Sequence, residues 1–336
     1  MKAGISRLAA SVALGGALMA GLAGCNPQSL PDVSQLPFLD KTPSVAEGLE
    51  SLSTASDASL ATPTIREDGV LTVGIDADAS LAPMCISGDN DTVSGIDIDL
   101  ASALADQLGL KVRFVSIVGT DEATADSCDV VMNVSPDSVS DSMVVGSYAE
   151  SASAFFHKGD SGVVSASDLA DKKVGVQSGS VSERALGKTG LDMTKTPYAN
   201  LNEAFDALEA GEIDYVLCDA YAGAFLAHSY GDLAFAGTLD APATRGIAVA
   251  SSNTELQVAI QQALDEALND GTYEAIRARW VGEFPTLTAD QQISDIPEAE
   301  SSTGDTQTDG SGEAEGDASD STEQTPAEAG SNAVTL

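Results

Sequence analysis

Residues 173–183, with the sequence KVGVQSGSVSE, combine a short apolar strand, a tight turn and the start of a helix. Ser178 and Gly179 form the turn, and Ser180 and Glu183 have the spacing of a capping box. A helix N-terminus at the end of a strand presents free N–H groups and a partial positive charge. The stretch therefore predicts a seat for a carboxylate or another small anion. A helix start with no ligand is the alternative.

The composition excludes several classes of protein. The chain has 336 residues, of which 52 are acidic and 15 basic, for a formal net charge of -37. Nucleic-acid-binding proteins need an excess of basic residues, and proteins held on anionic lipid need a basic patch. The histidines, His157 and His228, form no helical pair, and no Cys/His spacing is typical of a zinc site. We therefore expect no nucleic-acid partner, no metal and no cofactor.

The N-terminus is typical of a bacterial lipoprotein precursor. Lys2 and Arg7 precede an apolar segment, residues 8–21, that is too short to span a membrane comfortably. The following LAGC, which ends at Cys25, resembles a lipobox, where a lipid is attached to the cysteine and the chain is cleaved before it. We predict a signal peptide over 1–24 and a lipid anchor at Cys25, on the extracytoplasmic face of the cell membrane. An ordinary signal peptide with a chance cysteine is the alternative.

Two segments have compositions that do not suit a packed core. Residues 25–66 are rich in Ser, Pro, Ala and Asp, which predicts a flexible tether. An extra small domain is the alternative, but residues 49–60 show only a weak apolar pattern. Residues 291–336 hold eleven Asp or Glu and no Lys or Arg, so we predict a disordered acidic tail over 290–336. A solvating role for this tail is favoured over a binding role.

Strands and helices alternate between these two segments. Strands are predicted over 70–75, 112–117, 129–133, 173–177, 214–218 and 246–250, with an extended segment over 148–157. Helices are predicted over about 100–109, 200–211, 256–271 and 273–280, and from Ser180 onward. The alternation implies an α/β fold with mostly parallel strands. In such sheets ligands bind beyond the carboxyl ends of strands, where residues 178–182 and Asp219 are expected.

Three cysteines follow the predicted anchor. Cys85, Cys128 and Cys218 are an odd number, so they cannot form a complete internal disulfide set. Cys128 falls at the start of a predicted strand, whereas the other two fall near strand ends. A Cys85–Cys128 bridge is therefore not expected, and we predict that the three are buried small hydrophobic residues.

Residues 69–283 resemble the type II periplasmic solute-binding proteins, specifically the amino-acid-binding branch (family 3) of ABC importers. Five blocks carry the resemblance in order: GIDIDLA at 95–101, KVGVQSGSVSE at 173–183, the block from helix to strand and aspartate at 203–219, GIAV at 246–249 and RWVG at 279–282. One block alone is a weak signal, whereas five in register over about 215 residues are specific.

The resemblance implies a two-lobed type II periplasmic-binding-protein fold, in which two α/β lobes with mixed, mostly parallel sheets are joined by two hinge strands. The solute-binding domain would cover 67–289, with lobe 1 over about 67–152 and 248–289 and lobe 2 over about 157–243. Such a protein, expected to be a monomer, closes on a small polar solute and docks on a membrane ABC permease. The solute would be an amino acid or a related amine-bearing compound.

The resemblance also assigns binding residues. Asp219 matches the aspartate that accepts the α-ammonium group of the ligand in a charge-assisted hydrogen bond, with helix capping as the alternative. Ser180 and Val181 match positions whose N–H groups and hydroxyls hold the ligand carboxylate, although Val181 lacks a hydroxyl. Asn133 and Ser135 match loop positions in lobe 1 that hydrogen-bond the ligand.

The lobe 1 loop also holds the main departure from the family. Leu81 and Met84 fall where the family places aromatic rings against the solute. Ser138 stands where the family has an arginine that clamps the carboxylate in a bidentate pair. Losing such a buried contact removes about 2–5 kcal/mol. Either Arg245, on the returning hinge segment, supplies the charge, or the ligand is an amine, a modified amino acid or another small polar solute.

Three classes of function follow from these observations. The first is an extracytoplasmic lipoprotein that delivers a polar solute to an ABC importer. The second is an enzyme similar to cyclic acid dehydratases of this fold, which we do not expect because the matching arginine is absent and both histidines are poorly placed. The third is a sensor or scaffold lipoprotein that keeps the fold and has lost the ligand.

Overall fold

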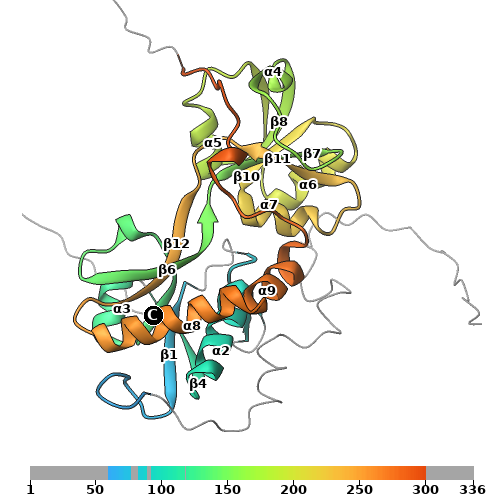
Figure 1. Cartoon of the computed structure of the whole chain (residues 1–336). Coiled ribbons are helices and arrows are strands. Elements are labelled where there is room, and N and C mark those ends of the chain that lie inside the picture. Colours follow the sequence, from blue (N-terminus) through green and yellow to red (C-terminus); the bar gives the residue numbers. More distant parts are fainter. Residues whose placement is uncertain (1–59, 77–81, 89–91, 118, 300–336) are drawn as a thin grey trace, which may run out of the picture. The chain divides into compact units, whose positions relative to one another are not determined.

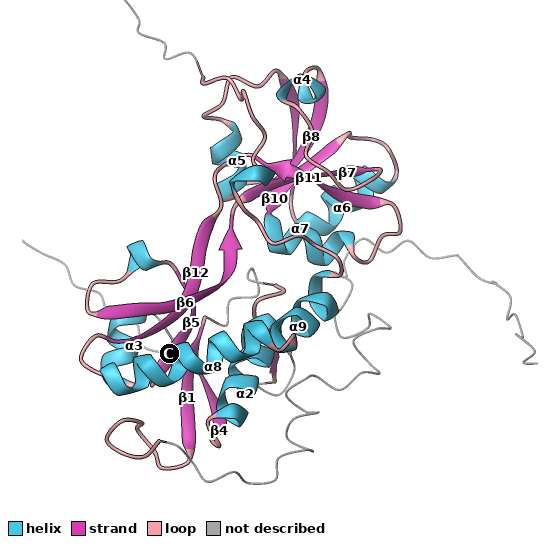
Figure 2. Cartoon of the chain, in the orientation of Figure 1, coloured by secondary structure: helices cyan, strands magenta, loops and turns pink. Residues whose placement is uncertain are grey.

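The structure is a computed structural model that describes residues 60–76, 82–88, 92–117 and 119–299 (Figure 1, Figure 2). The signal peptide, Cys25, Leu81 and the segment beyond residue 299 lie outside these residues, so what the sequence suggests for them stays a prediction. Within the described part, the chain forms two five-stranded sheets and one two-stranded sheet. None of the helices in that part is long and apolar enough to cross a membrane.

The first sheet has the strand order β4-β1-β5-β12-β6. Its strands are β1 (Val70–Ile75), β4 (Lys111–Ser116), β5 (Val130–Val134), β6 (Ser142–Ser151) and β12 (Ala243–Ala250). β1 is parallel to β4 and β5, whereas β12 is antiparallel to β5 and β6. Alternate side chains of a strand face opposite sides, so Val130 and Met132 join one apolar cluster and Val131 joins another. Both faces of this sheet are therefore covered.

Helices cover the two faces of the first sheet. They are α2 (Ile96–Gln107), α3 (Thr120–Asp126), α8 (Thr254–Asn269) and α9 (Thr272–Val281). α2, α8 and α9 contact one another and contribute to the larger apolar cluster, which continues into lobe 2, whereas α3 packs against β5 and β12 with the smaller one (Figure 1). A short ribbon of β2 (Ile86–Ser87) and β3 (Val93–Ser94) precedes α2. These elements form lobe 1.

The second sheet has the strand order β11-β7-β10-β8-β9. Its strands are β7 (Ser153–Lys158), β8 (Lys172–Gln177), β9 (Met193–Tyr198), β10 (Tyr215–Asp219) and β11 (Leu233–Thr238). The helices beside it are α4 (Ala166–Leu169), α5 (Val181–Leu186), α6 (Leu201–Glu209) and α7 (Ala220–Ala227). β8 is parallel to β9 and β10, whereas β7 is antiparallel to β10 and β11. These elements form lobe 2.

The predicted α/β class and two-lobed architecture are confirmed, but each sheet is more evenly mixed than expected. Within the described residues, four strand pairs of the two large sheets are parallel and four are antiparallel. The antiparallel pairs arise because β6 and β7 lead directly from one sheet to the other across Ala152, without a helical crossover. β12 returns to lobe 1 and lies beside β6 (Figure 2). Lobe 1 resumes at Ala243, five residues before the predicted position.

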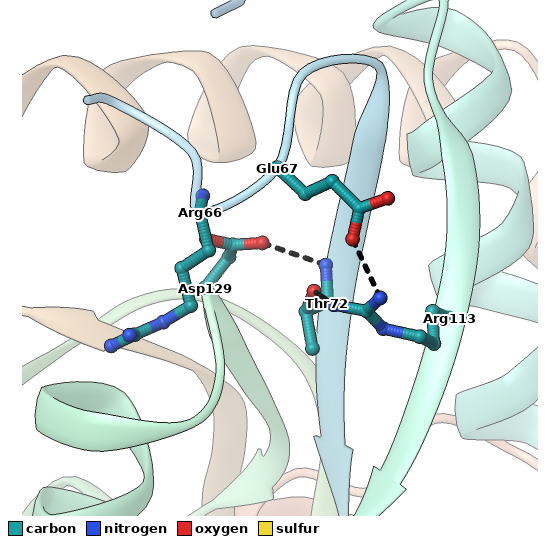
Figure 3. Close-up of polar contacts among 5 residues, drawn as sticks. All are labelled: Arg66, Glu67, Thr72, Arg113 and Asp129. Atoms are coloured by element: carbon teal, nitrogen blue, oxygen red, sulfur yellow. Dashed lines mark hydrogen bonds and ion pairs between the residues drawn. The ribbon is translucent and has the colours of Figure 1, made fainter. Parts of the chain in front are cut away.

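The predicted tether extends too far along the chain. Leu60 and Ile65 are buried in the core of lobe 1, although they fall within the segment 25–66 assigned to the tether. The Asp129 carboxylate accepts the backbone N–H groups of Arg66 at 2.8 Å and of Thr72 at 2.7 Å (Figure 3). These bonds attach the segment to the first strand of the sheet. The folded domain therefore begins no later than residue 60.

The same segment makes a second polar contact at its exposed side. Arg113 of β4 donates to Glu67 at 2.6 Å and to the hydroxyl of Thr72 at 3.0 Å (Figure 3). The Arg66 guanidinium donates to backbone carbonyls of residues 124–128. The tether prediction failed because these contacts come from residues far along the chain, which local composition does not reveal.

The folded part of the chain extends beyond the predicted boundary at residue 289. Residues 284–299, which we call the C-terminal strap, pack on lobe 2 and include the short helix η5 (Ala289–Gln291). Ile293 is 2% exposed, and its N–H donates to the Thr238 carbonyl at 2.9 Å. The N–H of Gly190 donates to the Pro297 carbonyl at 2.6 Å. The folded part therefore extends at least to residue 299 rather than ending at 289.

The cysteine prediction is confirmed. Cys85, Cys128 and Cys218 are free thiols with at most 3% exposure. Burial raises the pKa of the Cys85 thiol to about 12 and also raises those of Cys128 and Cys218. All three therefore act as packed apolar groups and not as reactive thiolates.

Candidate functional site

A pocket of about 360 Å³ lies in lobe 1 beyond the carboxyl ends of β1, β4 and β5. It is lined by Asp76, Ile117, Gly119, Thr120, Val131, Met132, Asn133, Val134, Ser135, Ser138 and Arg245. This is the position where ligands bind in sheets with parallel strands. Three predicted site residues, Asn133, Ser135 and Arg245, are therefore brought together in one pocket.

Asn133 and Ser135 shape the rim of this pocket. Asn133 has φ 60, a left-handed conformation that is uncommon for residues other than glycine and concentrates at functional sites. The carbonyl of Ser135 accepts the Ser138 N–H at 3.0 Å and the Ser138 hydroxyl at 2.8 Å, at the turn η4 (Pro136–Ser138). The Ser138 hydroxyl thus closes the turn in which the family's arginine would stand.

Arg245 enters the pocket from a different strand. β12 is antiparallel to β5 with Gly246 opposite Val134, so Arg245 lies just past the end of β5, next to the Ser135 turn. The residue is half-buried, and its guanidinium has no hydrogen bond or ion pair with any residue that the structure describes. Arg245 therefore brings a positive charge to the same pocket as Ser138.

Asp219 holds the start of α7. It is the last residue of β10, and its Oδ1 atom accepts the N–H groups of Tyr221 and Ala222, both at 3.0 Å. Asp219 is exposed by its accessible surface, although the protein atoms around its carboxylate raise its pKa, and the two backbone N–H groups and the charge of Arg245 lower it. The capping role considered from the sequence is therefore real. Both bonds use the same oxygen, and a carboxylate has further acceptor capacity on the other.

Several polar groups at the start of α5 are paired within the chain. The Ser180 hydroxyl accepts the Glu183 N–H at 3.0 Å, as the capping-box spacing predicted. The Glu183 carboxylate reaches back to the N–H of Gly179 at 2.6 Å and not to that of Ser180, which donates to Gln177. Lys195 of β9 donates to the same carboxylate at 2.8 Å. An acidic side chain of the chain itself thus lies at the predicted anion seat.

The remaining predicted residues do not line the pocket. Ser180, Val181 and Asp219 belong to lobe 2, and the pocket is lined without them. Val181 is 69% exposed, and its N–H in the first turn of α5 has no intrahelical acceptor. Met84 is 7% exposed in the core of lobe 1, so its side chain does not form a wall of the pocket.

Asp76 was missed from the sequence. It directly follows β1 and is one of the residues that line the pocket. The available signal was its place at the end of a predicted strand, which is the position where ligands bind in such sheets.

The motif GIDIDLA serves the scaffold rather than the pocket. Asp97 accepts the Tyr148 hydroxyl at 2.6 Å, and Asp99 accepts the indole N–H of Trp280 at 2.8 Å. These bonds tie α2 to the hinge strand β6 and to α9. Burial raises the pKa of Asp97 to about 7, an effect that the Tyr148 hydroxyl partly offsets.

The sequence matches a known protein family across most of the folded part. Residues 71–283 match the bacterial extracellular solute-binding proteins, family 3. TcyJ, an L-cystine-binding protein of Escherichia coli K12, is 31% identical over 131 residues, which cover 38% of this chain and 49% of that protein. A putative ABC transporter arginine-binding protein 2 of the same organism is 32% identical over 126 residues, 34% of this chain and 50% of that protein. The chain thus spans about half the length of these curated relatives.

Solved structures share the fold. An ancestral cationic amino acid solute-binding protein superposes with a TM-score of 0.55 at 28% identity, over 63% of this chain and 96% of that chain. A polar amino acid ABC uptake transporter substrate-binding protein from Streptococcus thermophilus gives a TM-score of 0.58 at 20% identity, over 65% of this chain and 88% of that chain. The second likeness concerns the fold alone.

Proposed function

This chain belongs to family 3 of the bacterial extracellular solute-binding proteins, and we propose that it captures a zwitterionic amino acid for an ABC importer. Arg245 binds the α-carboxylate and Asp219 binds the α-ammonium group. One observation carries the proposal. The Arg245 guanidinium lines the pocket beside Ser138, where the family's arginine is missing, and its charge acts on Asp219.

The charge arrangement suits such a ligand. A guanidinium presents paired donors that match a carboxylate, so Arg245 can replace the missing contact although it comes from another strand. Asp219 can accept an ammonium while its Oδ1 atom still caps α7. Asp76 also lines the lobe 1 pocket.

Binding requires movement of the lobes. Arg245, Asn133 and Ser135 line the lobe 1 pocket, whereas Asp219, Ser180 and Val181 belong to lobe 2 and lie outside it. Hinge closure across β6–β7 and β11–β12 is the usual way in which two such halves enclose a solute. In this proposal the closed form docks on a membrane permease.

The proposal includes a lipid anchor. The LAGC motif that ends at Cys25 supports cleavage before this residue and acylation of its side chain. The mature protein would then be a lipoprotein on the extracytoplasmic face of the membrane. Mass spectrometry of the mature N-terminus tests this directly, because an unmodified Cys25 or a cleavage elsewhere contradicts it.

One observation favours a second function. The Glu183 carboxylate accepts the N–H group of Gly179 at the start of α5, next to Ser180 and Val181, where a ligand carboxylate was expected. A protein that fills its own anion seat can serve as a sensor or scaffold with little affinity for a solute. Solute capture remains the favoured function because the charge of Arg245 is not neutralised in this way among the described residues.

A thermal-shift screen separates the two functions. The purified protein is unfolded and refolded to remove bound solute, and is then heated with each standard amino acid, L-cystine, simple amines, oligopeptides or organic acids. A ligand at about 100 times its dissociation constant stabilises the protein by about 2.7 kcal/mol, a shift of several degrees. No shift across this panel would favour the sensor or scaffold.

Substitution of Asp219 tests the ammonium contact. Asp219→Asn removes the charge but keeps a good N-cap residue, so the melting temperature without ligand should change little. Affinity for the amino acid should fall about tenfold or more, because a hydrogen bond to a charged group is lost. Asp265→Asn on α8 removes the same charge away from the pocket and should leave affinity unchanged. Equal affinities for the Asp219 variant and the wild type would contradict the assignment.

A further inference from the structure

Two stretches of chain on either side of β5 contribute to the rim of the lobe 1 pocket. Gly119 and Thr120 begin α3, whereas Ser135 and Ser138 belong to the turn that follows β5, and all four residues line the pocket. The whole of β5 separates the two stretches in the sequence, so a fixed distance between them needs a contact across the fold. The shape of the rim therefore depends on what holds α3 in place.

Apolar packing alone gives α3 little support. The helix lies beside β6 and β12, is seven residues long and has Ala123 and Thr124 as its buried residues (Figure 1). Ala123 joins the smaller apolar cluster of lobe 1, but a single methyl group buries little surface. Gly119, which precedes the helix at φ 86, provides no side-chain cap. A helix this short is marginal by itself, so polar contacts have to fix its position.

The Asp121 carboxylate supplies such contacts. Its Oδ2 atom accepts the N–H of Ser140 at 2.7 Å and the hydroxyl of the same residue at 2.9 Å. Its Oδ1 atom accepts the N–H of Ser142 at 2.9 Å. Hydrogen bonds to an ionised acceptor are about twice as strong as those between neutral groups. Asp121, which directly follows Thr120, is therefore joined to the chain just beyond Ser138.

This attachment is kept charged and has a second, deeper point. The donors to the carboxylate, with the Ser140 N–H foremost, hold the pKa of the Asp121 carboxyl well below its usual range. One helical turn further along α3, the hydroxyl of Thr124 lies 2.6 Å from the hydroxyl of Ser142, and both residues are buried. The start of α3 is thus attached to the start of β6 through two of its residues.

These contacts give Asp121 a part in binding although it is not among the residues that line the pocket. We propose that Asp121 is a positioning residue for solute capture, whose carboxylate holds Thr120 and the turn at Ser138 at a fixed distance before the solute arrives. A rim that is ordered in advance loses less conformational entropy on binding than a mobile rim. The proposal rests on the proposed function, because it assumes that the carboxylate of an amino acid binds in this pocket beside Arg245.

The first test needs no solute. Hydrogen exchange of the full-length protein, followed by NMR, should be slow at the amides of Ser140 and Ser142. In Asp121→Ala it should be about tenfold faster or more at these two amides, because their acceptor is lost. Asp129→Ala is the matched control, since it should accelerate exchange at Thr72 and leave Ser140 and Ser142 protected. Unchanged exchange at these two serines in Asp121→Ala would overturn the proposal.

The second test measures affinity for L-arginine and L-cystine by isothermal titration calorimetry, at a temperature at which every variant is folded. Asp121→Ala should weaken binding about tenfold or more, because the rim must then be ordered by the solute. Asp121→Asn keeps one acceptor oxygen and should lie between Asp121→Ala and the wild type.

Two controls separate positioning from stability and from charge. Asp129 accepts the N–H groups of Arg66 and Thr72 at the other end of β5, so Asp129→Ala should lower the melting temperature and bind as the wild type does. Glu122→Ala removes a negative charge from the next position of α3 and should also keep the wild-type affinity.

The outcomes distinguish this inference from the proposed function. Wild-type affinity in Asp121→Ala, or an equal loss of affinity in either control, would overturn the positioning role while solute capture stands. Failure of the wild type to bind either amino acid would count against amino-acid capture, and the positioning role would fall with it. Faster exchange at Ser140 and Ser142, with a loss of affinity confined to the Asp121 variants, is the result that supports the proposal.

Discussion

The start of α5 in lobe 2 and the pocket around Arg245 in lobe 1 differ in whether their polar groups already have partners within the protein. At α5, the N–H of Gly179 is paired with Glu183, and Glu183 with Lys195. In the pocket, the Arg245 guanidinium has no partner among the described residues. A ligand carboxylate at α5 would lie beside the internal Glu183 carboxylate, whereas the pocket offers it a guanidinium. The difference supports the proposal that lobe 1 supplies the principal contact to the ligand's negative group.

The strongest challenge to this comparison is the removal of Arg245. Arg245→Ala should weaken amino-acid binding by about 2–5 kcal/mol, because a buried guanidinium–carboxylate contact is lost. Calorimetry with the amino acid that gives the largest thermal shift measures the effect. Ser138→Arg in the Arg245→Ala background should recover part of the affinity by restoring a guanidinium to the same pocket. Unchanged affinity in Arg245→Ala would mean that lobe 1 does not hold the carboxylate.

A substitution in the C-terminal strap tests how much the packing of the strap on lobe 2 stabilises the protein. Ile293→Ala should lower the free energy of unfolding by about 2–4 kcal/mol, since Ile293 is 2% exposed beside Gly237. Urea unfolding measures the loss. Val258→Ala on α8, where the side chain is 56% exposed, is the control and should change stability little. If the two variants were equally stable, the packing of Ile293 would not contribute to folding, and the prediction that the tail begins at residue 290 would stand.

The pH dependence of stability probes the scaffold of lobe 1. Burial raises the pKa of Asp97 to about 7, so the folded state holds the proton more tightly than the unfolded state. The resulting stabilisation is complete below about pH 4 and is lost as the pH rises to 7. Asp97→Asn keeps an acceptor for Tyr148 without the charge, and should therefore raise the melting temperature by a few degrees at pH 8.

Near pH 4, Asp97→Asn should give no such gain, because Asp97 is already neutral there. Asp265→Asn on the surface of α8 is the control, and its difference from the wild type should not change in this way between pH 4 and 8. A constant difference for Asp97→Asn at both pH values would show that the carboxyl group is not protonated by burial.

The smallest effect concerns the cap of α5. Ser180→Ala removes the acceptor of the Glu183 N–H and should lower the free energy of unfolding by about 1 kcal/mol. Ser180→Asp, which keeps the cap, should preserve stability. If Ser180→Ala weakened amino-acid binding far more than it weakened folding, α5 would hold the ligand after all and the comparison would be reversed.

Local features of the fold were predictable from the sequence because neighbouring residues determine them. The cap at Ser180 depends on Glu183, three residues away, and β8 and β10 follow from short apolar runs. α7 was not predicted, since its sequence AYAGAFLA is apolar on all sides and has no helical period. The helix is buried on several faces, so burial obscured the periodicity by which a surface helix is recognised.

The sequence by itself determined the α/β class, the order of the elements, the family resemblance and the residues at strand ends. Only the tertiary structure decided which charges meet. Arg245 shares a pocket with Asn133 because β12 pairs with β5 in one register, and residues 60–66 and 284–299 join the core through contacts far along the chain. Strand register and long-range packing depend on the whole fold, whereas caps and strand propensities depend on a few adjacent residues.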